Sequence, residues 1–341
     1  MLFILGNARS GTTLLQVLLD AHPEIVGSPE SKFAVLFYPR YKHIKKWKES
    51  DIIDFVEHLY KEPLFVQLWH LDKEKLKKEL LKVKENATYS LLCKMVYYQM
   101  RNGKNNPLYL SDKNPEYTLY IDTILKMFPE AKFIHIIREP RDTIYSQMIS
   151  FKEKNSKFKA FKWLAFNTIV EGKKKKDPER YFTLLYENLV NDTEATMKDL
   201  SSFLNIPFSA SMAQNKNPEW LNAHLEKNVL TENAKPFYAN LLKPINPSKI
   251  GNWKNHMDVY DQTLAEIITG DFAHKMYGYE IDSNHKNKPV KISAYSLFKG
   301  NCLYFFWQMF KQVKVKSTRL NLLYARFRIM LNPNVRISKF F

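Results

Sequence analysis

The sequence holds few of the features that mark secreted proteins. Only two cysteines, Cys93 and Cys302, occur in 341 residues, and they lie far apart without a C-x-x-C pair. Such cysteine usage argues against a disulfide framework or a zinc site, and a reducing compartment is the expected setting. No positively charged stretch precedes the apolar residues 2–5, and this run breaks at Gly6. We therefore expect no signal peptide and a cytoplasmic location.

Acidic residues are absent from the segment 285–341, which contains twelve Lys or Arg residues. This segment supplies twelve of the net charge of +17 and leaves +5 for residues 1–284. It is also aromatic, with "LYFFWQMFKQVKVK" and "LLYARFRIM", and such a basic amphipathic stretch suits an anionic lipid surface. Its longest apolar run, 302–307, is far shorter than the roughly 20 residues that span a bilayer. Two hypotheses stay open: peripheral contact at the inner membrane face, or packing on the main domain.

Nucleic acid is the other polyanion that a basic chain can bind. The sequence contains no nucleic-acid recognition motif, so we expect no nucleic-acid partner.

Apolar patterning predicts an α/β fold of the P-loop type, with a parallel sheet flanked by helices on both faces. Residues 2–5, 107–110, 131–137 and a segment ending near Tyr186 are the predicted strands. The predicted helices are 12–21, 116–128, 141–151, 193–206 and 261–276, with a lysine-rich helical insertion at 41–101 and a long loop at 208–253. The expected organisation is a main domain, 1–284, and a basic aromatic C-terminal extension, 285–341.

The stretch "LFILGNARSGTT" lacks the lysine of a nucleotide-hydrolysing phosphate loop. A strand runs into Gly6, and Gly11 follows at the spacing of a Walker A loop, but Thr12 stands where the lysine belongs. That lysine contacts the β- and γ-phosphates, so its absence disfavours ATP hydrolysis. A glycine turn that opens a helix still favours an anion. The loop therefore predicts a site for a 5′-phosphate group that needs no metal.

A second anion site is predicted in "IHIIREPRDTIYSQM". Arg138 and Arg141 directly follow a buried strand, and Ser146 comes eight residues after Arg138. These groups are expected at the carboxyl edge of the sheet, where open α/β folds bind ligands. Two arginines and a hydroxyl can clamp an anion there. One nucleotide with phosphates at its 5′ and 3′ positions would engage both sites.

These segments resemble the sulfotransferases that use PAPS, 3′-phosphoadenosine 5′-phosphosulfate. "NARSGTTLLQVLLDAHPEI" is similar to the family's 5′-phosphosulfate loop, and "IIREPRDTIYSQM" to its 3′-phosphate motif. "PESKF", "SDKNPEYT", "LLYENLVND" and "SKIGNWKNHM" follow in the family's order, over roughly residues 1–280. The resemblance is strongest to the tyrosylprotein-sulfotransferase-like and bacterial branch. It implies transfer of a sulfonate group from PAPS to an acceptor hydroxyl, with release of 3′,5′-ADP and no metal.

The resemblance also implies roles for individual residues near the first strand. The 5′-phosphosulfate would be held by the loop residues Arg9, Ser10, Gly11, Thr12 and Thr13. Arg9 would also take part in catalysis. The alternative for Ser10 and Thr13 is a helix-capping role.

Two further residues are implied as catalytic. Glu30 would be the general base that removes the acceptor's proton, and Lys113 would neutralise the bridging oxygen of the leaving nucleotide. The alternatives for Glu30 are a surface carboxylate or an ion pair with Lys32, and the alternative for Lys113 is a solvated side chain. His22 is a second candidate base, with packing of the turn after the first helix as its other role.

At the other end of the nucleotide, Arg138 and Ser146 would bind the 3′-phosphate. Arg141 would assist them, or pair with Glu139 or Asp142. Tyr186 would lie against the adenine, or belong to the core. By the resemblance, a late loop would close over the nucleotide with Lys249, Gly251 and Trp253.

Two other functions remain open: a P-loop kinase or NTPase, and a non-catalytic, membrane-attached nucleotide-binding protein. The missing lysine and the lack of a convincing magnesium-binding aspartate disfavour the first. The acceptor is expected to contact the insertion 41–101 and the loop 208–250. Aromatic content and the amphipathic tail favour a lipophilic or membrane-borne alcohol such as a sterol or glycolipid, and the basic insertion also suits a glycan. Protein tyrosine is possible by resemblance and fits a cytoplasmic location less well.

Overall fold

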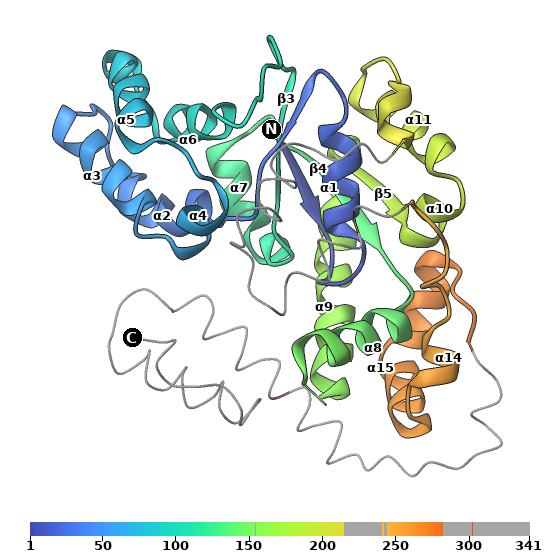
Figure 1. Ribbon diagram of the computed structural model, residues 1–341. Helices are drawn as coiled ribbons and strands as arrows, with labels where there is room; N and C mark the ends of the chain where they lie inside the picture. Colours follow the sequence, from blue (N-terminus) through green and yellow to red (C-terminus); the bar gives the residue numbers. More distant parts are fainter. Residues whose placement is uncertain (154, 215–240, 242–243, 282–301, 303–341) are drawn as a thin grey trace. The chain divides into compact units, whose positions relative to one another are not determined.

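The computed structural model describes residues 1–153, 155–214, 241, 244–281 and 302 (Figure 1). The chain divides into two compact units, which are treated separately below. The first unit comprises residues 1–137 and 169–247, and the second comprises 138–168 and 248–341. Apart from Cys302, the predicted extension 285–341 lies outside the described residues, as does most of the predicted loop 208–253.

A five-stranded parallel sheet forms the centre of the first unit (Figure 1). Its strands are β1 (Leu2–Leu5), β2 (Ile25–Gly27), β3 (Tyr109–Lys113), β4 (Lys132–Ile137) and β5 (Tyr181–Leu185), in the order β2-β3-β1-β4-β5. The β1 strand is buried along its whole length because it has neighbours on both edges and helices on both faces. This sheet confirms the predicted α/β fold.

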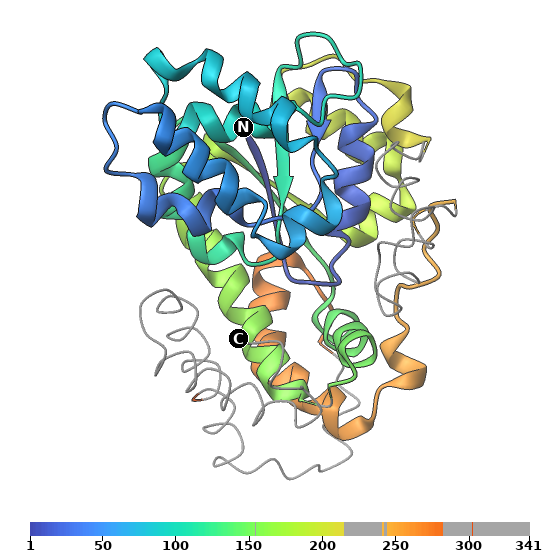
Figure 2. The same cartoon turned by 60° about the vertical axis from the view of Figure 1, so that its left-hand side comes forward.

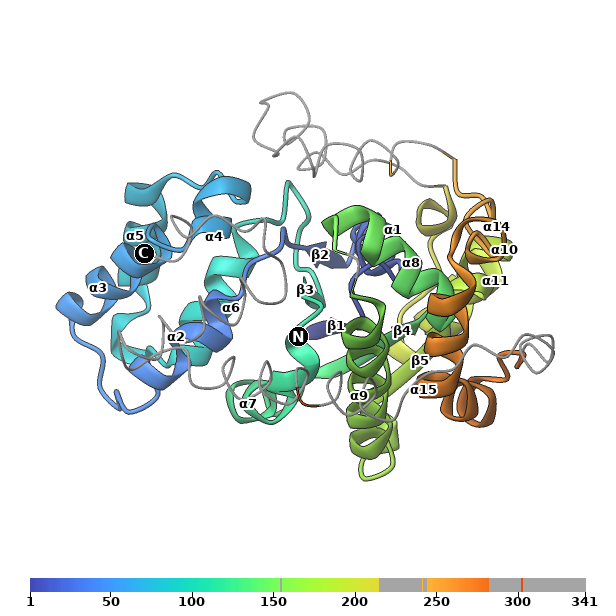
Figure 3. The same ribbon diagram turned by 90° about the horizontal axis from the view of Figure 1, so that it is seen from below.

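Helices cover both faces of the sheet. The helix α1 (Thr12–Asp20) packs over β2 and β3, and α7 (Ile121–Met127) lies on the opposite face (Figure 3). Behind α7, the ring of Phe3 in β1 contacts the rings of Phe128 and Phe133 at centroid distances of 5.8 and 6.1 Å. The helices α10 (Tyr186–Asn191) and α11 (Thr193–Leu204) follow β5 and pack against it.

The predicted helical insertion is confirmed and begins earlier than expected. It contains α2 (Phe33–Tyr41), α3 (Glu49–Leu59), α4 (Pro63–Leu68), α5 (Lys73–Lys82) and α6 (Tyr89–Tyr98), grouped beside the sheet in Figure 2. Its core is aromatic, because the ring of Phe33 contacts Phe65, Trp69 and Tyr97 at centroid distances of 5.0–5.8 Å. Side-chain caps from Glu62, Asp72 and Thr88 begin three of these helices.

The second unit is helical in its described part. It contains α8 (Pro140–Phe151), the first part of α9 (Ser156–Lys174), α14 (Trp253–His256) and α15 (Val259–Tyr277). The α15 helix packs along α8 and ends at Gly278, whose φ of 72° supplies the left-handed C-cap. This agrees with the predicted helix 261–276. None of the described helices is both long enough and apolar enough to cross a bilayer.

Candidate active site

The loop between β1 and α1 has the backbone of an anion-binding turn. Gly11 is the N-cap of α1, with φ 91° and ψ 10°, and Arg9 is also left-handed with φ 72°. A Cβ atom on Gly11 would lie 2.6 Å from Cδ2 of Tyr186, so only glycine fits against this ring. Tyr186 therefore lies directly against the loop. A left-handed backbone is strained at a non-glycine residue such as Arg9, and such strain is typical of functional sites.

The first turn of α1 leaves positive potential and polar groups available to an anion. Its N-cap makes no side-chain hydrogen bond, and the first turn carries no acidic residue. The Ser10 side chain is 1% exposed, and its hydroxyl has no hydrogen-bond partner among the described residues. A buried hydroxyl without a partner is costly, so a ligand oxygen would stabilise it. The Ser10 hydroxyl therefore makes no helix-capping hydrogen bond, and the loop has the features of an anion-binding turn.

Three polar side chains meet where β2 and β3 end. The two strands are parallel neighbours, so the loop that follows Gly27 lies near the end of β3. The Nζ atom of Lys113 lies 2.8 Å from Oε2 of Glu30, and Nδ2 of Asn114 donates to Oε1 of Glu30 at 3.1 Å. The side chain of Glu30 remains 29% exposed, whereas that of Lys113 is only 6% exposed. The carboxylate is therefore held from the protein side and open to solvent on the other.

Two of the plainer alternatives, a Glu30–Lys32 ion pair and a solvated Lys113, are not observed. Lys32 pairs with Glu116 at 2.8 Å rather than with Glu30, and Lys113 is buried rather than solvated. Asn114 is a site residue that the sequence interpretation missed. Its place directly after Lys113 in "SDKNP" was the available signal.

His22 does not have the geometry of a general base. Its Nδ1 accepts a hydrogen bond from the backbone N–H of Glu24 at 3.1 Å, so Nε2 carries the proton and donates to the carbonyl of Pro207 at 2.9 Å. Both ring nitrogens are engaged and the residue is buried. His22 therefore stabilises the turn after α1.

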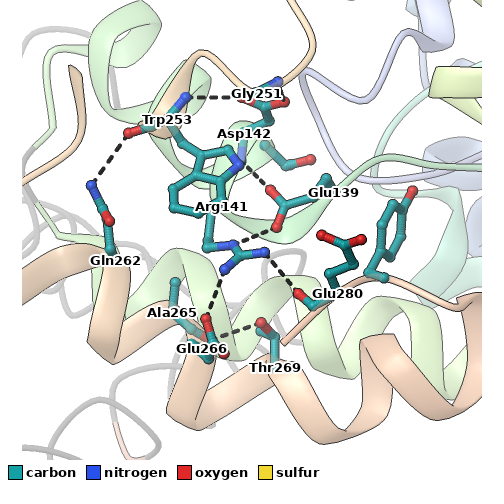
Figure 4. Close-up of polar contacts among 12 residues, drawn as sticks. Glu139, Arg141, Asp142, Gly251, Trp253, Gln262, Ala265, Glu266, Thr269 and Glu280 are labelled. Carbon is teal, nitrogen blue, oxygen red and sulfur yellow. Dashed lines mark hydrogen bonds and ion pairs between the residues drawn. The ribbon is translucent and has the colours of Figure 1, made fainter. Parts of the chain in front are cut away.

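In the second unit, Arg138 and the late loop come together on α8. Asp142 accepts hydrogen bonds from the backbone N–H groups of Gly251 at 2.7 Å and Trp253 at 3.1 Å (Figure 4). Arg138 is buried; its Nη2 donates to the carbonyl of Lys249 at 2.6 Å and lies 3.6 Å from Oδ2 of Asp142. Asp142 thus anchors the loop, a role that the sequence interpretation missed, although its place in the first turn of the helix that follows Arg138 was the available signal.

Arg141 has a structural role in this unit (Figure 4). Its guanidinium donates to Glu139 at 2.6 Å and to Glu266 at 2.7 Å, and lies 3.8 Å from the centre of the Trp253 ring. Burial raises the pKa of Glu139 to about 7 even with Arg141 beside it. Of the two predicted alternatives for Arg141, pairing with Glu139 is the one observed, and the Trp253 ring is 4% exposed beneath it.

For the remaining predicted residues, the structure gives the position and the burial but does not test a role in nucleotide binding. Ser146 is half-buried on α8, two turns after Arg138, and the side chain of Lys249 is exposed. Thr12 is buried and Thr13 half-buried at the start of α1. Their assignment to the nucleotide stays a prediction.

Comparison with known proteins identifies the class. A model of the sulfotransferase family matches residues 2–210, more than half of the chain, and the chain belongs to this family. Protein-tyrosine sulfotransferase A of Caenorhabditis elegans is 26% identical over 309 residues, covering 86% of this chain and 71% of the relative. The omega-hydroxy-beta-dihydromenaquinone-9 sulfotransferase Stf3 of Mycobacterium bovis is 25% identical over 249 residues, covering 60% of this chain and 62% of the relative.

The fold is shared with a solved structure. The sulfotransferase domain from the curacin biosynthetic pathway superimposes with a TM-score of 0.56 at 21% identity, covering 82% of this chain and 98% of that domain. The predicted family is confirmed, and the protein is an enzyme of the sulfotransferase type.

Proposed function

We propose that this sulfotransferase takes its sulfonate group from PAPS, transfers it to an acceptor hydroxyl and releases 3′,5′-ADP. The observation that carries the proposal is the group of Glu30, Lys113 and Asn114 at the ends of β2 and β3. The β1 strand is the other neighbour of β3, and it leads into the anion-binding loop between β1 and α1. Acid–base and anion-binding groups therefore share one edge of one sheet.

The donor's 5′-phosphosulfate is assigned to the loop. The N–H groups at the start of α1, the Ser10 hydroxyl and the Arg9 guanidinium would bind its oxygens. Thr12 and Thr13 would add hydroxyl donors. Tyr186, whose ring lies against Gly11, would border the nucleotide beside the loop.

The chemistry follows from charges that move during transfer. The acceptor oxygen attacks sulfur while its proton passes to the Glu30 carboxylate. The bond between sulfur and the bridging oxygen of the nucleotide breaks, and its electron pair stays on that oxygen. Lys113 neutralises this developing charge, which is the electrostatic contribution expected to matter most. Asn114 holds the other carboxylate oxygen of Glu30, so the base is oriented before the acceptor arrives.

The 3′-phosphate is assigned to Arg138 and Ser146 of the second unit, with Lys249, Gly251 and Trp253 forming the loop beside it. The family resemblance and the hydrogen bond from Arg138 to the carbonyl of Lys249 support this assignment. A 3′-phosphate is the group that distinguishes PAPS from ATP, so these residues would set donor selectivity.

For the acceptor we propose a lipophilic or membrane-borne alcohol, such as a sterol or glycolipid, ahead of a glycan. One relative is named for an ω-hydroxylated menaquinone, and others are named for protein tyrosine. The basic aromatic segment 285–341 would hold the enzyme at an anionic cytoplasmic membrane face, where a lipid alcohol is accessible.

The test is transfer from ³⁵S-labelled PAPS to a panel of sterols, glycolipids, oligosaccharides and tyrosine peptides, with and without magnesium. We expect one class to be labelled, equally in both conditions. Glu30→Gln should lower turnover at least about 100-fold, as loss of a general base does, with affinity for 3′,5′-ADP within about twofold. Glu116→Gln removes a carboxylate paired with Lys32 nearby and is the matched control. Nucleotide binding without transfer would instead support a non-catalytic nucleotide-binding protein. ATP hydrolysis would support a P-loop kinase or NTPase.

A further inference from the structure

A buried carboxyl group that the mechanism above does not use lies directly before Lys113. Asp112 in β3 is 0% exposed and is paired in register with Phe3 of β1. Its Oδ2 accepts hydrogen bonds from two tyrosine hydroxyls: Tyr97 of α6, at 2.5 Å, and Tyr117 of the short 3-10 helix Tyr117–Tyr120. Its Oδ1 has no hydrogen-bond partner in the described part of the chain. A fully buried carboxyl is costly to the folded state, so its presence at this position points to a role.

The Tyr117 hydroxyl links this carboxyl to the backbone beside Glu30. It lies 2.8 Å from the carbonyl oxygen of Ser31, the residue after Glu30. A hydroxyl has one proton, so Tyr117 can donate to Asp112 or to Ser31 but not to both. When Asp112 is neutral it can donate to the Tyr117 oxygen, and Tyr117 is then free to donate to Ser31.

Ser31 is held at a second point. Its hydroxyl donates to Oε2 of Glu62 at 2.9 Å, and the same carboxylate caps α4. The backbone that carries Glu30 is thus fixed by Tyr117 on one side and Glu62 on the other. Because Asp112 is also bonded covalently to Lys113, one buried carboxyl is connected to both members of the Glu30–Lys113 pair.

We propose that Asp112, Tyr97 and Tyr117 form a positioning cluster that sets the geometry of the Glu30–Lys113 pair for sulfonate transfer. The proposal rests on the function proposed above. None of the three touches the reacting atoms. Asp112 acts on Lys113 through the strand and on Glu30 through Tyr117 and the Ser31 carbonyl.

The charges around Asp112 agree with this geometry. Burial raises the pKa of Asp112 to about 7; the Glu30 carboxylate acts in the same direction, and the hydrogen bonds from Tyr117 and Tyr97 act against it. The Cys93 thiol of α6 also faces the site, and burial raises its pKa. Both hydrogen-bonding patterns of Tyr117 are therefore accessible near neutral pH.

The decisive variant is Tyr117→Phe, which removes only the hydroxyl between Asp112 and Ser31. The matched control is Tyr89→Phe, because Tyr89 is a buried tyrosine of α6 whose hydroxyl donates to the carbonyl of Ala34 at 2.7 Å. The assay is transfer from ³⁵S-labelled PAPS to the acceptor sulfated in the panel, or to water if none is. We expect Tyr117→Phe to lower kcat at least about tenfold, with KM for PAPS and Kd for 3′,5′-ADP within about twofold. Tyr89→Phe should lower the Tm similarly and leave kcat within about twofold.

Substitution of Asp112 supplies the rescue test. Asparagine can place its amide oxygen where Oδ2 lies and accept from both tyrosines, or place its NH2 there and donate to both, so Asp112→Asn should keep most of the kcat that Asp112→Ala loses. If Tyr117→Phe loses no more kcat than Tyr89→Phe, the positioning role is wrong and the proposed function stands. If the wild-type protein transfers sulfonate to neither acceptor nor water, the proposed function fails and this inference with it.

Discussion

At the scale of single residues, the contact between Gly11 and Tyr186 shows how closely the phosphate loop is built. Gly11 combines a left-handed backbone with a ring at 2.6 Å from where its Cβ would stand. Any side chain must therefore both strain the backbone and displace an aromatic ring. The ring belongs to Tyr186, the first residue of α10 and directly after β5, so the loop's shape depends on a segment far away in sequence.

Gly11→Ala should therefore destabilise the donor site more than the same substitution at a left-handed glycine that has no neighbouring ring. We expect a cost of about 1 kcal/mol for the left-handed alanine and about 1–3 kcal/mol more for the clash, with affinity for 3′,5′-ADP at least about tenfold weaker. Gly103→Ala is the control, since its φ is 79° and nothing lies within 4 Å of its Cβ position. Urea unfolding and calorimetric titration measure the two effects. Equal outcomes for both variants would contradict a steric role for Tyr186.

The raised pKa of Asp112 predicts a pH-dependent stability. The carboxyl ionises near 3.8 in the unfolded chain and at about 7 when folded, so the folded state binds more protons between these values. The free energy of unfolding should then fall as pH rises from 4 to 7, by up to about 1.4 kcal/mol per pH unit. Asp112→Asn lacks this contribution, so its stability relative to wild type should increase between pH 5 and 7 in urea unfolding.

Glu139 titrates in the same window but is present in both proteins, so its contribution cancels in the difference. A difference between wild type and Asp112→Asn that does not change with pH would show that Asp112 is already ionised at pH 5.

At the scale of elements, the loop before α14 is attached to the start of α8 by hydrogen bonds. Asp142 accepts two backbone N–H groups from this loop, and Arg138 donates to a third backbone group in it. The loop and the predicted 3′-phosphate residue are thus anchored on one helix. A change in this anchor should affect the recognition of one end of the nucleotide.

Asp142→Asn should weaken binding of 3′,5′-ADP by about tenfold, because the N–H groups of Gly251 and Trp253 bond different carboxylate oxygens and the amide replaces one of these oxygens by an NH2, which cannot accept. Binding of AMP, which lacks the 3′-phosphate, should change by less than about twofold. Asp258→Asn alters the cap of α15 in the same chemical way and serves as the control. Calorimetric titration measures the affinity of each variant for both nucleotides. Equal weakening of 3′,5′-ADP and AMP binding by Asp142→Asn would contradict the assignment of the 3′-phosphate to this loop and Arg138.

Sequence periodicity was sufficient for elements with an uninterrupted apolar pattern and insufficient for those whose pattern is short or broken. The β1, β4, β5, α1, α11 and α15 elements agree with the predictions because each has a clear apolar pattern between polar or glycine boundaries. The β2 strand is only three residues long, and α2 contains Pro39, so neither has a strong local signal. The α9 helix was missed although Trp163, Phe166 and Val170 are buried in it, because lysines interrupt the pattern.

The candidate site also has features that the sequence predicted and features that it did not. Glu30, Lys113 and the loop residues were predicted from the resemblance, but their contact depends on β2 and β3 being neighbours. Strand order arises from non-local pairing, which no local pattern contains. Asp112 and Asp142 were missed for this reason, since their partners lie on other elements.

At the scale of the whole molecule, the charge is concentrated at one end of the sequence. Residues 285–341 carry twelve of the positive charges and no negative ones. A polybasic segment gains about 1 kcal/mol per Lys or Arg near an anionic lipid surface, and salt screens this attraction. The proposed membrane contact therefore predicts both lipid and salt dependence.

Deleting residues 285–341 should greatly reduce sedimentation with vesicles that contain phosphatidylserine. Binding of the full chain should itself weaken as salt rises from 50 to 500 mM, and vesicles of phosphatidylcholine alone are the control. Affinity for 3′,5′-ADP should stay within about twofold, since the predicted nucleotide residues precede this segment. Unchanged sedimentation after deletion would contradict membrane contact through the extension.

The position of β1 in the sheet has a consequence for biosynthesis. Its four apolar residues form the central strand, yet both neighbours, β3 and β4, are encoded more than one hundred positions later. At about 5–20 residues per second, the ribosome needs several seconds or more to deliver them. During that interval β1 has no strand to pair with, and the nascent chain should be a client of chaperones that bind short apolar segments.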